Sequence, residues 1–206
     1  MTRATLVQAV VTLARQDPML ANTLEEFGMP PMWQRRQNFH TLVHVVLEQK
    51  VSLGSAQAVM NRVLALCPGM QPVDFLGIRD SSLRQAGISE RKLSYCRSIA
   101  QAITGDELNF SRLRRCPDTQ VMEQLTAVRG IGPWTAGVYL MMALRRPDAW
   151  ASGDRALAVS LAECDSLDSI PDYAQLDARA EHWRPFRGAA ARLLWHAYLC
   201  RRGRAG

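Results

Sequence analysis

Paired cysteines are missing from this sequence. Its five cysteines are scattered along the chain, no Cys-x-x-Cys pair occurs, and the count is odd. A zinc ribbon is therefore not expected, and a framework that pairs every cysteine in a disulfide is excluded. We expect reduced, mostly buried cysteines, as in a cytoplasmic protein. The five residues are Cys67, Cys96, Cys116, Cys164 and Cys200.

Long apolar runs are also missing. No segment reaches ~18 uninterrupted apolar residues, which argues against a membrane-spanning helix. The apolar stretch near the start is ended by Arg15 and lacks a small-residue cleavage pattern, so we interpret it as an amphipathic helix rather than a signal peptide. Internal repeats, low-complexity segments and long linkers are absent too, and nothing marks independent domains.

Strand-like alternation is nearly absent, whereas apolar residues recur at helical spacing along most of the chain. Proline and glycine separate these stretches, as they do between helices. The sequence therefore predicts an all-α fold. The expected helices cover residues 3–16, 38–49, 54–66, 72–76, 80–86, 89–103, 118–128, 133–145, 154–163, 173–180 and 187–201.

The composition allows a substantial core. The chain has 206 residues with 48% hydrophobic content, which is enough for one compact enzyme or for two small lobes. The 25 basic and 19 acidic side chains give a net charge of +6. Such a balance favours a polyanionic partner, although many ordinary proteins share it.

A helical hairpin is predicted within residues 118–145. Asp118, after Pro117, is typical of a helix start because its side chain can cap backbone N–H groups, and Gly130 is expected to end this helix. Pro133 then starts a second helix, since proline is tolerated at the first helical position.

The turn between these helices, Gly130-Ile131-Gly132, is suited to binding an anion. Both glycines can adopt backbone angles closed to other residues, and neither has a side chain that keeps a phosphate away from the turn's N–H groups. Ile131 is expected to pack inward, and the start of the second helix offers further N–H groups. An ordinary hairpin has the same signature, so the surrounding sequence must decide.

Four blocks of sequence resemble the helix-hairpin-helix DNA glycosylases, specifically their 3-methyladenine (alkylated-base) branch. They occur in the order of that family and cover roughly residues 38–200. The blocks are residues 39–52, Gly87-Ile88-Ser89 with Lys92, the hairpin with Asp154, and residues 183–187 leading to Trp195.

This resemblance implies that residues 1–206 form one glycosylase unit, with two helical lobes flanking a DNA-binding cleft. Residues 48–145 would form a central lobe, and residues 1–47 together with 146–206 would form the other. The resemblance also implies a monomer that acts on double-stranded DNA containing damaged bases, in the cytoplasm of a bacterial-type cell.

Some relatives carry a four-cysteine iron–sulfur cluster after the catalytic region. Only Cys164 and Cys200 follow Asp154 here, so we expect no cluster. In relatives, backbone carbonyls of the hairpin can hold a Na⁺ or K⁺ ion, which leaves no signature among side chains. We therefore expect no required cofactor and no metal held by side chains.

Asp154 is the predicted catalytic residue. Breaking an N-glycosidic bond leaves positive charge on the sugar, so a carboxylate stabilises the oxocarbenium-like transition state and can orient or deprotonate the attacking water. Asp154 matches the family's acid beyond the hairpin, although Gly153 and Arg155 flank it where relatives often have a second acid or an apolar residue. The alternative role is a helix N-cap. Asp148 is the nearest upstream competitor.

A lysine at the start of the second hairpin helix is missing. In glycosylases that also cut the DNA backbone, such a lysine forms a Schiff base with the sugar. Its place in this sequence is occupied by Trp134. No lysine follows Lys92. The resemblance therefore implies a monofunctional enzyme with water as the nucleophile.

Trp134 and Trp195 match pocket tryptophans of this branch. A flipped base is held against aromatic faces, and an alkylated purine carries positive charge that an indole attracts by ~0.5–2 kcal/mol. Core packing is the alternative for both residues. Val138 and His196 stand where some relatives place a pocket tyrosine, so the base pocket is expected to include them.

Residues 49–52 resemble the segment that fills the gap left by the flipped base. Gln49, Lys50 and Ser52 are the predicted DNA contacts there, and Gly130, Ile131, Gly132 and Thr135 are those of the hairpin. Lys50 stands where many relatives have leucine or glutamine; it could fill the gap with its alkyl stem or simply be solvated. Ser52 could instead cap the next helix. Isolated basic residues that either contact phosphates or are solvated are Lys92, Arg97, Arg129 and Arg187.

Three hypotheses follow. The first is a monofunctional glycosylase of base excision repair that flips alkylated bases such as 3-methyladenine and 7-methylguanine and hydrolyses their N-glycosidic bond. The second is a glycosylase for deaminated or oxidised bases. The third is a DNA-binding hairpin protein without catalysis, against which Asp154 and the two tryptophans argue, because binding alone needs neither.

Overall fold

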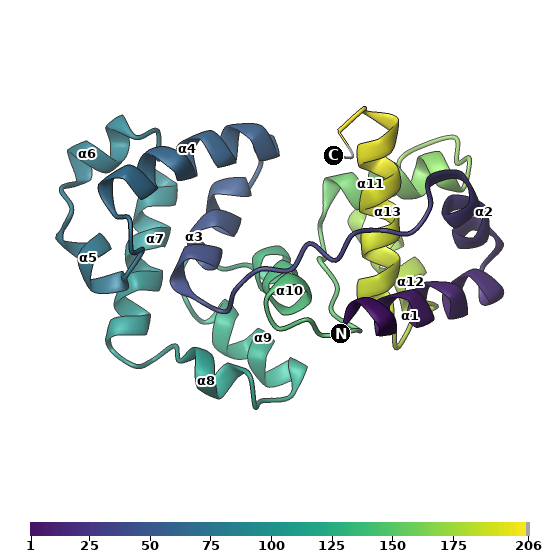
Figure 1. Cartoon of the computed structure of the whole chain (residues 1–206), viewed down its shortest axis with the longest axis horizontal. Helices are drawn as coiled ribbons and strands as arrows, with labels where there is room; N and C mark the ends of the chain where they lie inside the picture. The colour runs from purple at the N-terminus through teal and green to yellow at the C-terminus, as the bar shows by residue number, and fades with distance from the viewer. Residues whose placement is uncertain (205–206) are drawn as a thin grey trace. The chain divides into compact units, whose positions relative to one another are not determined.

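The computed structural model describes residues 1–204, and all regular structure within them is helical, as the sequence predicted. The helices are labelled in Figure 1. They are α1 (Arg3–Gln16), α2 (Pro18–Phe27), α3 (Phe39–Glu48), α4 (Leu53–Leu66), α5 (Pro72–Gly77), α6 (Asp80–Gln85), α7 (Glu90–Thr104), α8 (Phe110–Leu113), α9 (Asp118–Thr126), α10 (Pro133–Met142), α11 (Arg155–Cys164), α12 (Tyr173–Glu181) and α13 (Arg187–Arg201).

Short polar side chains start most of these helices. Each accepts a hydrogen bond from a backbone N–H of the first turn, which would otherwise lack a partner. Such caps are Thr2, Asp17, Asn38, Ser52, Ser89, Asn109, Asp154 and Asp172. The predicted cap at Asp118 is wrong: α9 begins at that residue, and its N-cap position is Pro117, which makes no side-chain cap hydrogen bond.

Two helices of the structure are not among those that the sequence predicts. Helix α2 begins directly after α1, with Asp17 as its N-cap and Pro18 at its first position. Helix α8 has four residues, which is too short for a periodic pattern. Both hairpin helices are also shorter than predicted, since α9 ends at Thr126 and α10 at Met142.

The chain divides into two compact units. The central unit comprises residues 35–139, and the terminal unit comprises residues 1–34 and the chain from residue 140 onward. These bounds differ from the predicted lobes, 48–145 and the two ends. Helix α3 lies in the central unit because it packs against α4 and α7.

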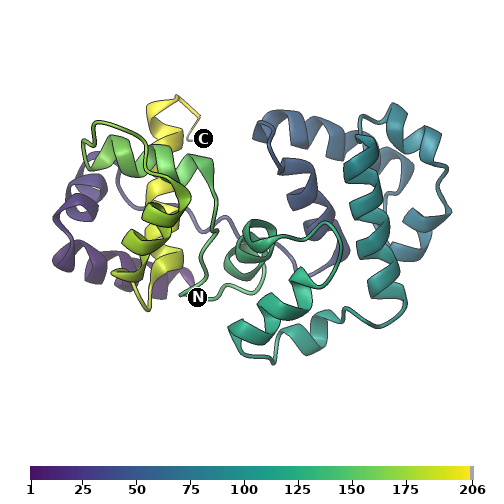
Figure 2. The same cartoon turned by 180° about the vertical axis from the view of Figure 1, so that it is seen from behind.

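The terminal unit is built around α13, which packs against α1, α2 and α11 (Figures 1 and 2). Buried leucines from these helices form its core. They are Leu6, Leu13, Leu20, Leu157, Leu161, Leu193 and Leu194.

In the central unit, α7 packs against α3, α5 and α6. Its core includes Phe39 and Phe75, whose rings meet edge to face at 5.4 Å. The hairpin helices α9 and α10 follow α7 in the chain. No helix within the described residues is both long enough and apolar enough to cross a membrane.

Candidate active site and hairpin

The hairpin turn needs a glycine at Gly130 but not at Gly132. Gly130 has φ +95°, a conformation that side chains disfavour, and a Cβ there would lie 2.3 Å from Cβ of Tyr95. Gly132 is exposed, has no positive φ, and a Cβ there would meet no atom within 4 Å. Of the two glycines that could adopt such backbone angles, only Gly130 does so.

Gln49 holds this turn. Its Nε2 donates to the carbonyl of Gly130 at 3.0 Å and to Oγ1 of Thr135 at 2.9 Å. Thr135 is only 1% exposed, and Ile131 is buried as predicted. The side chains of Gln49 and Thr135, both predicted DNA contacts, thus bond to each other inside the central unit, and a role in binding DNA stays a prediction.

Lys50 lies in the short connection between α3 and α4. It is exposed and has φ +57°, which is uncommon for a residue with a side chain. Ser52 caps α4 by accepting from the backbone N–H of Ser55 at 3.2 Å. Lys92 also supports this region, because its Nζ donates to the carbonyl of Leu47 at 2.7 Å. The structure thus presents the Lys50 side chain on a supported turn.

Asp154 is the N-cap of α11 and is 7% exposed. Its Oδ1 accepts from the backbone N–H of Leu157 at 2.8 Å and from the indole N–H of Trp195 at 3.3 Å. The positive end of a helix dipole stabilises a carboxylate at this position by about 0.3–1 kcal/mol. The structure therefore brings together two predicted site residues that are far apart in the sequence.

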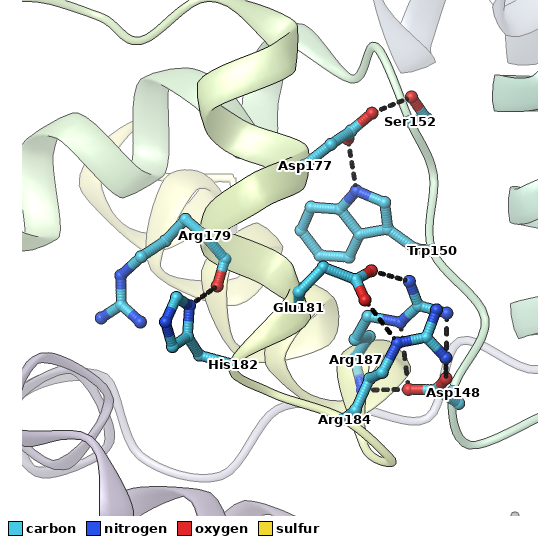
Figure 3. A network of polar contacts seen from close by, with 9 residues as sticks. All are labelled: Asp148, Trp150, Ser152, Asp177, Arg179, Glu181, His182, Arg184 and Arg187. Atoms are coloured by element: carbon cyan, nitrogen blue, oxygen red, sulfur yellow. Dashed lines mark hydrogen bonds and ion pairs between the residues drawn. The ribbon is translucent and has the colours of Figure 1, made fainter.

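Asp148, the upstream competitor, is engaged in ion pairs (Figure 3). Its Oδ2 lies 2.8 Å from Nη1 of Arg184 and 2.9 Å from Nη2 of Arg187. Two guanidinium groups leave this carboxylate little negative charge to offer a developing cation. Asp154 is the better candidate.

The four predicted pocket residues are divided between the units. Trp134 is half-buried and Val138 is buried in the central unit. Trp195, 9% exposed, and His196 belong to the terminal unit, where Nε2 of His196 lies 2.9 Å from the carbonyl of Phe27. Their membership in one base pocket stays a prediction.

Several basic residues that could have contacted phosphate are used within the units. The Arg97 guanidinium pairs with Asp80 at 2.6 Å and donates to backbone carbonyls, and Arg187 binds Asp148. Arg129 at the hairpin is exposed. No local pattern in the sequence shows which arginines find an internal partner.

Within residues 1–204, no group of three or more His, Cys, Asp or Glu side chains is placed to hold a metal ion. The hairpin turn offers backbone carbonyls instead. Among these, the carbonyl of Val128 accepts from the N–H of Ile131 at 3.1 Å, and that of Gly130 accepts from Gln49. Each carbonyl oxygen has a second lone pair. A Na⁺ or K⁺ ion bound at this turn stays a prediction.

An all-helical fold with a glycine-containing hairpin, followed by a carboxylate at the head of a later helix, is the arrangement expected of a helix-hairpin-helix glycosylase. The model of the HhH-GPD superfamily of base excision DNA repair proteins matches residues 43–185. The chain belongs to this superfamily.

Two relatives of this chain are named as DNA-3-methyladenine glycosylases. The chain is 29% identical over 166 residues to DNA-3-methyladenine glycosylase 1 of Schizosaccharomyces pombe, covering 79% of this chain and 73% of the relative. It is 30% identical over 157 residues to DNA-3-methyladenine glycosylase of Saccharomyces cerevisiae, of which it spans about half the length, 49%.

Two solved structures, both of proteins named for 3-methyladenine, are also similar to this chain. A DNA-3-methyladenine glycosidase from Bacillus halodurans is 31% identical with a TM-score of 0.74, and the match covers 94% of this chain and 88% of that one. The S. pombe 3-methyladenine DNA glycosylase in complex with abasic DNA is 23% identical with a TM-score of 0.86, covering 95% and 97%, and shows a shared fold.

Proposed function

We propose that this protein is a monofunctional DNA glycosylase of base excision repair that hydrolyses the N-glycosidic bond of alkylated bases such as 3-methyladenine and 7-methylguanine. Family membership and relatives named for 3-methyladenine support this function. The protein acts, in this proposal, as a monomer on double-stranded DNA that contains damaged bases. It does so in the cytoplasm of a bacterial-type cell.

The main structural support for this proposed activity is the way in which the Asp154 carboxylate is held. It is held by the N–H of Leu157 and by the indole of Trp195, both at Oδ1. Fixed in this way, it stabilises the positive charge that develops on the sugar as the base leaves, and it orients the water that attacks the sugar carbon. Cleavage transfers the bonding electrons to the base, which leaves the cationic alkylated purine as a neutral base. The water supplies the oxygen that remains on the sugar and gives up one proton to the Asp154 carboxylate.

The hairpin and the turn at Lys50 hold the DNA. Gly132 leaves the exposed turn open to a phosphate, and N–H groups at the start of α10 attract it. The exposed side chain of Lys50 enters the gap left by the flipped nucleotide, where its alkyl stem replaces stacking and its ammonium group reaches a phosphate.

In this proposal the flipped base is contacted by side chains of both units: Trp134 and Val138 of the central unit, and Trp195 and His196 of the terminal unit. An alkylated purine is already positively charged, so it leaves without a strong general acid, and electron-rich indole faces select it. The carboxylate and the aromatic faces therefore suffice for the reaction.

A lyase step is not part of the proposed reaction. A Schiff base with the sugar needs an amine nucleophile, and Trp134 stands at the position of the lyase lysine. The expected product is an abasic site in an uncut strand. A Na⁺ or K⁺ ion held by the hairpin carbonyls would add positive charge beside a DNA phosphate, and no other cofactor is required.

The test is release of free 3-methyladenine and 7-methylguanine from methylated duplex DNA. Wild-type protein should release them in the presence of EDTA without cutting the strand. Asp154→Asn should lower the rate by about 10²-fold or more, because the charge that stabilises the transition state is lost. No release despite salt-dependent DNA binding would contradict the proposal and favour another lesion or a non-catalytic binder.

A further inference from the structure

The chain segment that leads to Asp154 has no regular secondary structure, but every second residue of it makes a polar side-chain contact. Residues 147–153 belong to no helix. Ala149 and Ala151 are buried, whereas the side chains that alternate with them, Asp148, Trp150 and Ser152, make polar contacts with α12 and with the residues after it (Figure 3). The path of this segment is therefore set by side chains.

Asp177 of α12 makes two of these contacts with a single carboxylate. Its Oδ1 accepts from the indole N–H of Trp150 at 2.7 Å, and its Oδ2 accepts from the hydroxyl of Ser152 at 2.5 Å (Figure 3). Hydrogen bonds to a charged acceptor are the strong ones, and two of them from residues i and i+2 fix both the position and the direction of the chain.

Ser152 is only two residues from the proposed catalytic carboxylate. The connection is a tight turn in which the N–H of Asp154 donates to the carbonyl of Ala151 at 3.2 Å, with Gly153 at φ +80°. A displacement of Ser152 is therefore transmitted directly to Asp154. The helix α11 fixes Asp154 from the other side through the bond from Leu157.

We propose that Asp177 is a positioning residue for Asp154: by binding Trp150 and Ser152, it sets the place of the catalytic carboxylate. This inference rests on the proposed glycosylase function. A carboxylate that stabilises a transition state must be placed within a fraction of an ångström, and a misplacement of about 1 Å can cost 10²-fold in rate.

A purely structural role for Asp177 makes a different prediction. Trp150 also packs against Trp183, with ring centroids 5.9 Å apart, so the segment keeps apolar contacts without Asp177. A structural role would lower stability and leave the chemical step unchanged in the protein that remains folded. A positioning role lowers the chemical step in folded protein with unchanged DNA affinity.

The experiment measures base release from methylated duplex DNA with enzyme in excess, together with affinity for a duplex that carries an abasic site. Asp177→Ala should slow release by about 10- to 100-fold without loss of affinity. Asp177→Asn should recover most of the rate, because its amide can accept from Trp150 and donate to Ser152. Glu163→Gln is the control: it alters a carboxylate on α11 that pairs with Arg202, and it should match the wild type.

A double variant, Asp177→Ala with Asp154→Asn, gives a second test that distinguishes a positioning role of Asp177 from a structural one. If Asp177 acts through Asp154, Asp177→Ala should cost no further rate in the Asp154→Asn protein, so the two effects are not additive. Should Asp177→Ala fail to fold, Ser152→Ala removes one contact without leaving an unpaired carboxylate, and it should still slow release.

The possible results are distinct. A normal rate in Asp177→Ala, or in Ser152→Ala if that is the variant that folds, overturns the inference, and so does a loss that persists in full on the Asp154→Asn background. A wild type that releases no base overturns the proposed function, and this role with it, before any variant is compared.

Discussion

The two glycines of the hairpin turn should respond differently to the same substitution. Gly130→Ala places a methyl group on a residue with φ +95° and directs it at Tyr95, whereas Gly132→Ala places one on an open, exposed residue. We expect the first variant to be strongly destabilised and the second to fold like the wild type.

The magnitude has two parts. A left-handed backbone costs a residue with a side chain about 1–2 kcal/mol. The new Cβ would also lie 2.3 Å from Cβ and Cγ of Tyr95, far inside van der Waals contact, and overpacking of this kind costs about 1–3 kcal/mol once the neighbours shift. Together, Gly130→Ala should lose about 2–5 kcal/mol of unfolding free energy, against less than about 1 kcal/mol for Gly132→Ala.

Urea unfolding followed by circular dichroism measures both values. Binding to an abasic duplex adds a second readout: Gly132→Ala should bind more weakly although it is stable, because its methyl group keeps a phosphate from the turn. Adding Tyr95→Ala to Gly130→Ala should restore only a fraction of the steric loss, because alanine removes the ring but keeps the Cβ that lies 2.3 Å from the new methyl group, and it leaves the backbone part unchanged. Equal stability of the two glycine variants would refute this reasoning.

Three further predictions concern single side chains. Gln49→Ala should lower the free energy of unfolding by about 1–3 kcal/mol, because the turn loses both hydrogen bonds, as urea titration will show. Tyr139→Phe should be neutral or stabilising by up to about 1 kcal/mol in the same assay, because the buried hydroxyl has no partner among the described residues. Burial opposes the charge of Asp17, but hydrogen bonds from Trp183 and Arg179 outweigh it and hold its pKa below the usual value. The stability that Asp17 adds is therefore present above about pH 4 and lost in stronger acid, so wild type and Asp17→Asn should converge there.

The sequence predicts the bounds of long helices well, because an apolar period over four turns is a clear signal. The bounds of α1 and α13 agree with the predicted ranges, 3–16 and 187–201. Helix α2 is not predicted although Asp17 and Pro18 are typical of a helix start, because the same two residues also end α1. The division into units depends on which helices pack together, and no local sequence pattern shows which helices do so.

The site was predictable only in part. Resemblance to the family pointed to Asp154 and Trp195, and the structure places them in contact. The partners of Gln49 are 81 and 86 residues away in the sequence, and Asp177 lies 25 residues beyond Ser152. Contacts of this kind arise from tertiary packing, so a single sequence identifies the residues without showing what they bind.

The two roles considered for Asp154, helix cap and catalytic carboxylate, are compatible. The cap bond from Leu157 and the indole bond from Trp195 both reach Oδ1, and they orient the carboxylate while the helix N-terminus favours its charge. Capping is thus one way in which the fold holds this carboxylate in place. Asparagine caps helices about as well as aspartate, whereas alanine costs about 1 kcal/mol. Asp154→Asn should therefore keep the stability of the wild type and lose base release, whereas a capping role alone would leave base release intact.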